Sequence, residues 1–220
     1  MIRWILPFVI LMPVSWCWGA GPSFEDVTIS SGVSPMHGGS PNAFSTGAAF
    51  FDWDLDGWPD LLVGDGQSNP SLYRNSGPPD FLFEDVSEQA GLTEFPIQSN
   101  CVNARDFTGD GIVDILLMRQ GVYGGLRLLA GTVSGVFRDE TATRLETARS
   151  NYQALSAFDA DSDGDLDVVA TRWAFMSPAQ ESDCLESHFL ENHDGILRLA
   201  TAGAPMTKGC GLVGALTDVN

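Results

Sequence analysis

The nine residues Asp52-Trp-Asp-Leu-Asp-Gly-Trp-Pro-Asp60 follow the pattern D-x-D-x-D-G-x-x-D, and this pattern returns further along the chain. A second copy, with threonine at its third position, is Asp106-Phe-Thr-Gly-Asp-Gly-Ile-Val-Asp114, and a third is Asp159-Ala-Asp-Ser-Asp-Gly-Asp-Leu-Asp167. A fourth copy begins at Asp218-Val-Asn220. The copies start 54, 53 and 59 residues apart. A period of this length is typical of repeat architectures.

Similar segments surround each copy of the pattern. A short apolar run precedes each copy, at 47–51, 103–105, 155–158 and 214–217. Another apolar run follows each of the first three copies, at 61–63, 115–118 and 168–171. Each unit then has a third run, at 71–75, 126–129 or 188–192, and an outer run, at 81–86, at 136–141 or, in degenerate form, near 197–200. Runs this short, bounded by Gly and polar residues, predict strands rather than helices.

Four short strands per unit of about 55 residues predict an all-β fold, a β-propeller of four-stranded blades. Phe24-Glu-Asp-Val-Thr28 resembles the outer strand and precedes the first unit, where it is expected to complete the last blade of a closed ring. Residues 21–220 are therefore interpreted as one incomplete propeller, with an opening strand, three blades and the start of a fourth. Because propellers have roughly 4–8 blades, the chain is expected to be an N-terminal fragment of a longer protein.

The acidic loops are predicted to bind Ca²⁺, a hard cation that takes about 6–8 oxygen ligands. Side chains at positions 1, 3 and 5 can converge, Gly at position 6 permits a sharp turn, the carbonyl at position 7 can face the ion, and Asp at position 9 closes the site. The predicted ligands are Asp52, Asp54, Asp56, Trp58 and Asp60; Asp106, Thr108, Asp110, Ile112 and Asp114; Asp159, Asp161, Asp163, Asp165 and Asp167; and Asp218 and Asn220. The second loop has only three carboxylates, so its affinity is expected to be the lowest.

The repeated loops have two alternative interpretations. An EF-hand shares the opening D-x-D-x-D-G but needs Glu at position 12, where this chain has Val63, Leu117 and Ala170. Metal-free Asp/Gly-rich turns are the second alternative. They would leave many like charges close together without compensation, which disfavours them when the pattern recurs in register.

The first twenty residues have the build of a secretory signal peptide. Arg3 is followed by an apolar run and then by small residues near Gly19 and Ala20. A retained membrane anchor is the alternative, but Pro7 and Pro13 interrupt the run, which is short for a span of about 20 residues. No stable membrane span is therefore expected, and the protein is expected to be secreted, at the cell surface or periplasmic. In such a compartment Cys184 and Cys210 could pair, which would leave Cys101 as a buried thiol.

The composition excludes some classes of binding partner. The chain has 29 acidic and 11 basic residues, and its net charge of −18 argues against nucleic acid and anionic lipid as partners, because like charges repel. The hydrophobic content of 44% is that of a globular protein rather than a disordered one. Thirteen of the acidic residues belong to the repeated loops, so much of the charge is interpreted as metal ligand.

The loops and their flanks resemble the FG-GAP/VCBS repeat family, whose blades form integrin-α-type propellers. Phe24–Thr28, Phe51–Gly57, Leu72–Asn75 and Phe83–Leu92 together look most like the secreted cartilage acidic protein (ASPIC/UnbV-like) group. The resemblance covers residues 23–220. It implies a propeller with Ca²⁺ in these loops and an extracellular or cell-surface location.

The function predicted from these features is that of a non-catalytic interaction or adhesion module with structural Ca²⁺, whose partner is an extracellular protein or glycan. The alternative is the propeller part of an extracellular carbohydrate-active or other hydrolytic enzyme whose catalytic residues lie elsewhere. A calcium sensor that changes shape is a third possibility. His37, His188 and His193 belong to no catalytic motif, and Trp53 and Trp58 are expected to pack between blades.

Overall fold

The computed structural model describes residues 24–34, 47–65, 68–94, 99–119, 124–146, 152–172 and 187–200. Several predictions fall outside these ranges: the signal peptide, the Cys184–Cys210 pair, the strand at 214–217 and the fourth loop with Asp218 and Asn220. They stay predictions. Among the described residues, no helix has the length and apolar character needed to cross a membrane.

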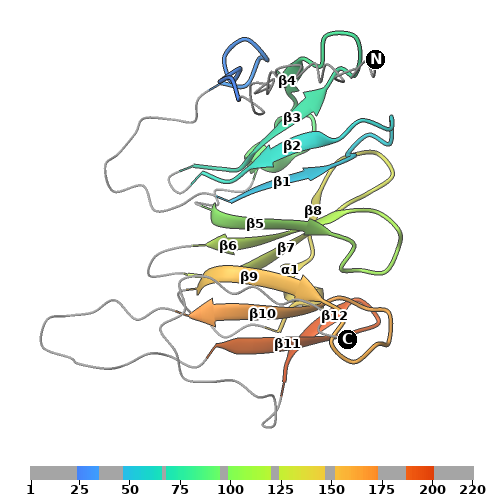
Figure 1. Ribbon diagram of the computed structural model, residues 1–220. Coiled ribbons are helices and arrows are strands. Elements are labelled where there is room, and N and C mark those ends of the chain that lie inside the picture. Colours follow the sequence, from blue (N-terminus) through green and yellow to red (C-terminus); the bar gives the residue numbers. More distant parts are fainter. Residues whose placement is uncertain are drawn as a thin grey trace, which may run out of the picture.

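The described chain forms three four-stranded antiparallel sheets, each built from consecutive strands (Figure 1). The first contains β1 (Ala48–Phe51), β2 (Asp60–Val63), β3 (Ser71–Asn75) and β4 (Phe83–Asp85). The second contains β5 (Ser99–Arg105), β6 (Asp114–Arg119), β7 (Gly125–Ala130) and β8 (Arg138–Asp139). The third contains β9 (Tyr152–Phe158), β10 (Asp167–Arg172), β11 (His188–His193) and β12 (Ile196–Leu199). Three sheets of this kind confirm the all-β prediction and are consistent with propeller blades.

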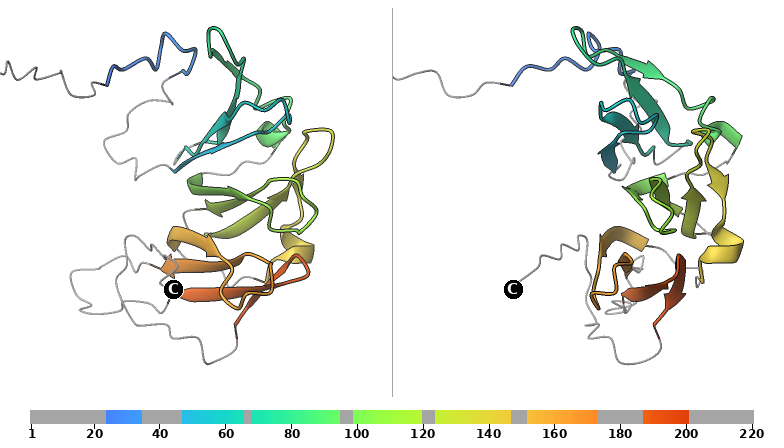
Figure 2. Two further views of the ribbon diagram at one scale, coloured as in Figure 1. Left: turned by 45° about the vertical axis from the view of Figure 1, so that its right-hand side comes forward. Right: turned by 90° about the vertical axis from the view of Figure 1, so that its right-hand side faces the viewer.

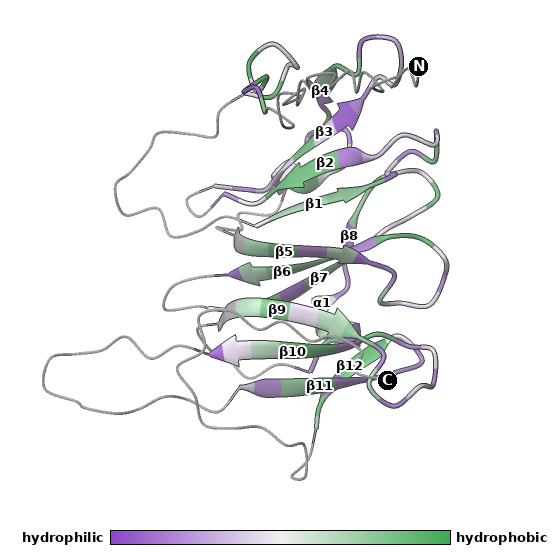
Figure 3. Cartoon of the chain, in the orientation of Figure 1, coloured by the Kyte–Doolittle hydropathy of each residue, from purple (hydrophilic) through white to green (hydrophobic). Residues whose placement is uncertain are grey.

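The sheets lie side by side in chain order, as Figures 1 and 2 show. Apolar side chains pack between neighbouring sheets in two core clusters. One core cluster joins the first and second sheets and a second cluster joins the second and third. The side chains of β6 alternate between the two: Ile115 and Leu117 belong to the first cluster, and Leu116 and Met118 to the second. Because successive side chains of a strand point to opposite faces, this continuous apolar run is buried on both faces. Figure 3 shows apolar residues along β1, β2 and β6 and hydrophilic residues interspersed in strands such as β3, β7 and β11.

The outer strands differ from the prediction in two of the three sheets. The weak outer run of the third unit forms a complete strand, β12, because the tight turn Asp194-Gly195, with φ of 54° and 75°, folds it back onto β11. The outer strand of the second unit shrinks to the two residues of β8, and the short helix α1 (Thr141–Arg144) follows it. A second helical element, the 3₁₀ turn Leu92–Glu94, follows the first sheet.

The segment Phe24–Thr28 forms no strand within the described structure, and because the last blade that it was predicted to complete is not among the described residues, that role stays a prediction. None of the described strands pairs with it, and Phe24 is 99% exposed. Its polar groups are used locally instead: the Thr28 amide donates to Asp26 Oδ1 at 3.0 Å, and the Ser31 amide donates to the Val27 carbonyl at 2.8 Å. Without a neighbouring strand to accept its hydrogen bonds, a short segment with Asp and Thr favours such turns.

Equivalent registers place the three acidic loops at one end of the sheets. Each loop joins the first strand of a sheet to the second, and the pairs that close the loops are Phe51 with Asp60, Arg105 with Asp114 and Phe158 with Asp167. The loops therefore all lie on the right in the view of Figure 1.

Candidate metal sites

The Asp at position 9 of each loop is a buried structural group as well as a predicted ligand. Asp60 accepts hydrogen bonds from the amides of Trp53 and Asn75, both at 2.7 Å. Asp167 accepts from the amides of Ala160 at 2.9 Å and Asn192 at 2.8 Å. Each carboxylate therefore ties the start of its loop to the end of the third strand. A buried carboxylate is stable only when hydrogen bonds or opposite charge compensate it, and here the main chain supplies the hydrogen bonds.

Asp114 holds its loop in the same way with one more bond. Its Oδ2 accepts from the amides of Phe107 and Thr108, and its Oδ1 accepts from the amide of Gly131, all at 2.8 Å. Burial raises the pKa of Asp114, as it also raises those of Asp60 and Asp167, although these backbone hydrogen bonds lower each value in part.

The carboxylates at positions 1 and 5 organise the turn itself. Asp52 accepts from the amides of Asp56 at 3.0 Å and Gly57 at 2.9 Å, and Asp106 and Asp159 bind the corresponding glycine amides of their loops. Asp56, Asp110 and Asp163 each accept from the amide two residues later at 2.9 Å. The glycine at position 6 has φ of 84–98° in the three loops, a conformation that favours glycine. All three loops thus adopt the turn that the repeated pattern predicted.

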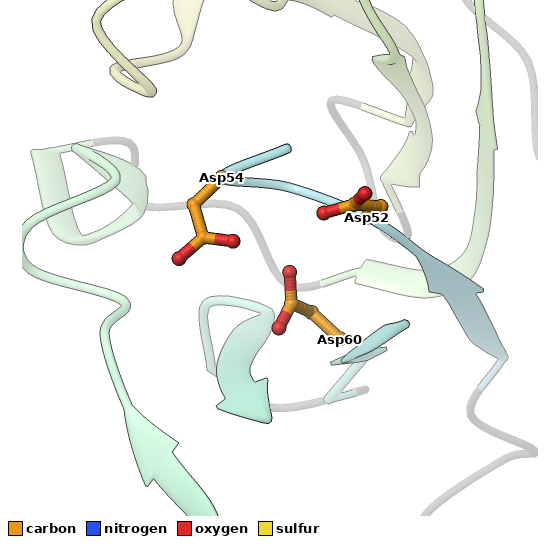
Figure 4. A group of neighbouring side chains, drawn as sticks. All are labelled: Asp52, Asp54 and Asp60. Atoms are coloured by element: carbon orange, nitrogen blue, oxygen red, sulfur yellow. The ribbon is translucent and has the colours of Figure 1, made fainter. Parts of the chain in front are cut away.

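Two of the loops bring three carboxylates together. In the first, one oxygen each of Asp52, Asp54 and Asp60 lie within 4.8 Å of one another, and Figure 4 shows the three carboxylates turned toward a common centre. In the third, Asp159, Asp161 and Asp167 are related in the same way. Oxygens bound to one ion at 2.3–2.6 Å lie at most about 5 Å apart, so the spacing suits a single cation, and all-oxygen donors suit a hard one. These two triads could hold a metal ion.

The second loop has no such triad of acidic side chains among its described residues. The Thr108 hydroxyl, which replaces the carboxylate at position 3, is buried and makes no hydrogen bond. A buried hydroxyl oxygen without a partner fits the predicted role of Thr108 as an oxygen donor to a cation. The second loop therefore retains one neutral donor where the other loops have a carboxylate, and the lower affinity expected for it stays a prediction.

The other predicted ligands have different surroundings. The position 5 residues Asp56 and Asp163 are outside the triads, and Asp56 forms an ion pair with Arg74 at 3.3 Å. The side chain of Asp165 accepts a hydrogen bond from the Asp194 amide at 2.9 Å, which joins the third loop to the β11–β12 turn. The predicted roles of the carbonyls of Trp58, Ile112 and Asp165 stay predictions.

Arg74 is a basic residue of the first site that the loop pattern did not reveal. It lies on β3 next to Asn75, and its guanidinium forms ion pairs with Asp54 and Asp56. The hydrogen bond to Asp54 raises the pKa of Arg74, so the side chain stays charged. The third blade has Glu191 at this place, before Asn192. The first loop thus carries its own positive counter-charge, and no basic side chain forms an ion pair with the third loop among the residues that the structure describes.

Replacing Arg74 with glutamine should raise the calcium affinity of the first loop about two- to fivefold, because exposed ion pairs of this kind are worth about 0.5–1 kcal/mol. The substitution removes the cation that competes for Asp54 and leaves the carboxylates in place. Calorimetric titration with calcium measures the change, with Arg198→Gln, an exposed residue of β12, as the control. Weaker calcium binding in Arg74→Gln would show that Arg74 holds the ligands in position instead of competing with the ion.

Two asparagines are also part of the sites. The Asn75 side chain donates to the Pro59 carbonyl at 3.1 Å, and the Asn192 side chain donates to the Leu166 carbonyl at 3.2 Å. Asn192 also donates to the Phe107 carbonyl of the neighbouring blade at 2.9 Å, which links the second and third loops. The sequence contains a signal for both asparagines, because the third apolar run of the first unit, 71–75, and that of the third unit, 188–192, each end in Asn.

The comparison with known families agrees with the repeat. The family model for the FG-GAP-like repeat matches residues 52–117 and again residues 106–170. Each match begins at the first Asp of a loop and extends through the next loop into the strand that follows it. No curated protein matches the chain.

Proposed function

The chain belongs to the FG-GAP-like repeat family, and from this premise we propose that it is an extracellular calcium-binding β-propeller module that acts by binding a partner and not by catalysis. The observation that carries the proposal is that blades one and three bring carboxylates together from the same positions, 1, 3 and 9, of the repeated loop. Convergence at equivalent positions, with only oxygen donors, supports a role in binding the same hard cation.

The proposed role of calcium is structural. Asp52, Asp54 and Asp60 would hold one ion, and Asp159, Asp161 and Asp167 a second, with Thr108, Asp106, Asp110 and Asp114 as the weaker third set. Bound calcium would supply positive charge where the loops concentrate carboxylates. The position 9 carboxylates are already fixed by backbone amides, so the ion would add its stabilisation to a preformed turn.

Extracellular location is supported by the signal-like segment at residues 1–20. It is also supported by the combined resemblance of Phe24–Thr28, Phe51–Gly57, Leu72–Asn75 and Phe83–Leu92 to the secreted cartilage acidic protein group. Extracellular calcium modules work with dissociation constants of about 0.1–1 mM, so calcium at this concentration would fill sites of this kind.

A non-catalytic role is supported by how the titratable side chains are used. Both ring nitrogens of His188 are engaged, by the Tyr152 hydroxyl at 2.7 Å and by Arg172 at 3.0 Å. Because Arg172 can only donate, His188 Nε2 accepts, and the proton of the neutral ring is on Nδ1. Burial lowers the pKa of His188, and so does the nearby Arg172. A histidine fixed in this way is poorly placed to accept a proton from a substrate.

Calorimetric titration of calcium into the chelator-treated chain tests the proposal. We expect at least two bound ions, one lost in Asp52→Asn/Asp54→Asn and the other in Asp159→Asn/Asp161→Asn. Asp80→Asn, an exposed acid outside the loops, is the matched control and should bind as the wild type does. An unchanged number of ions in both double variants, or no binding at about 10 mM calcium, would refute calcium binding at these loops.

A further inference from the structure

A cavity of about 210 Å³ opens between the first two blades, at the end that carries the acidic loops. The first loop forms one wall with Phe51 to Leu55, and the β7–β8 connection forms the other with Gly131 to Gly135. Ile112 and Val113 of the second loop also line it. A cavity of about 150 Å³ with apolar walls is large enough to take benzene, so this one has room for an aromatic side chain.

The cavity is preformed and its floor is apolar. Phe51 and Phe137 are buried members of the core cluster between the two blades, and Trp53 packs against that cluster. The indole Nε1 of Trp53 donates to the Gly135 carbonyl of the neighbouring blade at 2.8 Å. A Cβ at Gly135 would lie 3.0 Å from the indole ring, so glycine is the residue that lets the ring lie against this turn. Trp53 therefore packs between blades, as expected, and also forms a fixed wall of the cavity.

Exposed apolar residues mark the rim. Leu55, at the tip of the first acidic loop, is 75% exposed, and Val133, on the opposite wall, is 94% exposed. Leu55 also has a φ of 60°, which leucine adopts rarely. Exposed apolar groups around an apolar cavity are typical of binding surfaces.

The two acidic loops that line this cavity are themselves negative in every metal state. The first loop has four carboxylates and the second has three, and Arg74 is the basic residue that forms ion pairs with the first. One divalent ion in each loop would still leave both loops negative. The surface therefore complements a basic ligand whether or not calcium is bound.

We propose that this cavity receives an aromatic side chain of a partner protein, from a segment in which basic residues flank the aromatic one. The aromatic ring inserts between Trp53 and the 131–135 turn, and the flanking cations face the acidic loops. Aromatic side chains buried in well-packed pockets are frequent anchors of binding hot spots. The inference rests on the proposed role as an interaction module and adds to it the site and the chemistry of the partner.

Peptide titrations followed by NMR test the site. The probe is acetyl-Lys-Phe-Lys-amide, and its reference peptides are acetyl-Lys-Ala-Lys-amide and acetyl-Glu-Phe-Glu-amide. We expect the Phe peptide to bind at least about tenfold more tightly than the Ala peptide, because a buried aromatic ring is worth that much. The Glu peptide should bind more weakly, with the difference reduced at high salt. The amide signals of Gly131 to Gly135 and the Trp53 indole signal should shift.

A matched pair of variants locates the contact. Leu55→Ser/Val133→Ser removes the apolar rim and should weaken the Phe peptide about fivefold or more. Val27→Ser/Ile29→Ser is the control, because these residues are 51% and 70% exposed on the N-terminal segment, and should bind as the wild type does. All four positions are exposed, so melting temperatures are expected to stay unchanged.

Three results of the peptide titrations would overturn the inference: equal binding of the Phe and Ala peptides, NMR shifts confined to residues outside the cavity, and unchanged binding by the rim variant. Self-association of the chain, or its binding to phosphatidylserine vesicles, would also overturn the inference if the rim variant abolished it, because the rim would then bind another occupant. Each titration is run with calcium and with chelator. Calcium binding without peptide binding refutes this site alone, and peptide binding without calcium binding refutes the calcium proposal alone.

Discussion

Replacing Asp114 with alanine is expected to lower the free energy of unfolding by about 3–6 kcal/mol, even in the presence of a chelator. The carboxylate accepts three backbone hydrogen bonds, from Phe107, Thr108 and Gly131, in a fully buried position. Alanine leaves these donors without an acceptor, at a cost of about 1–3 kcal/mol for each one that water cannot reach. Domains have free energies of unfolding of about 5–15 kcal/mol, so this one change is expected to remove a large part of the protein's stability.

Urea unfolding in chelator measures the effect, with two further variants for comparison. Asp110→Ala is the control from the same loop, because its exposed carboxylate accepts from the Ile112 amide alone, and it should cost less than about 1 kcal/mol. Asp114→Asn keeps one acceptor oxygen and should lie between the two, which gives a measurable value if the alanine variant fails to fold. Equal stabilities of Asp110→Ala and Asp114→Ala would contradict the structural role of position 9.

The same carboxylate makes the ion-free protein sensitive to pH in a defined direction. Burial raises the pKa of Asp114 above its ordinary value of 3.8, so the folded protein holds the proton more strongly than the unfolded chain does. Its contribution to stability is therefore greatest below pH 3.8 and is lost as the pH rises through the raised value. Without calcium, stability should increase on mild acidification, and the increase should be smaller in Asp114→Asn.

Calcium is expected to raise the melting temperature by about 10–20 °C. An ion present at 100 times its dissociation constant stabilises the folded state by about 2.7 kcal/mol per site, and two sites give about 5 kcal/mol. For a chain of about 200 residues, each kcal/mol shifts the melting temperature by roughly 2–4 °C. The third loop should account for the larger part, because the first already has Arg74 as a counter-charge.

Thermal melts in calcium, in magnesium and in chelator check this prediction. Asp159→Asn/Asp161→Asn should lose more of the calcium-dependent shift than Asp52→Asn/Asp54→Asn, and Asp80→Asn should lose none. Magnesium should substitute poorly, because it demands a tighter octahedral shell than a loop of this size provides. A melting temperature that is the same in calcium and in chelator would exclude a structural role for the ion.

Much of the fold could be predicted because the repeat fixes local structure by short-range rules. An acidic turn with glycine at φ near 90° allows the chain to fold back, and the apolar runs on both sides of it then pair as strands, as at Phe51 and Asp60. The strand predicted at Phe24–Thr28 depends on a partner strand in the last blade, so the three described sheets do not test it. The prediction also treated the third outer strand as degenerate, although the Asp194-Gly195 turn is enough to form β12.

The sites were predicted in outline but not in detail. The loop pattern identified the triads, but it assigned Asp60 and Asp167 only the role of ligand, and their hydrogen bonds to strand-end amides became visible in the structure. Arg74 and Glu191 occupy the same place in two blades, and only tertiary contacts distinguish a counter-charge from a surface residue. The cavity beside Trp53 depends on two blades meeting, which no local pattern encodes.

The alternation of β6 between two core clusters has a consequence for aggregation. Its segment Ile115-Leu-Leu-Met118 has the β-propensity and low charge of a self-associating sequence, and it stays hidden only while both neighbouring sheets are in place. Asp114 and Arg119 flank the segment and act as charged gatekeepers at its two ends. Loss of either outer sheet would expose one face of this strand, so the first and third blades protect the second from intermolecular pairing.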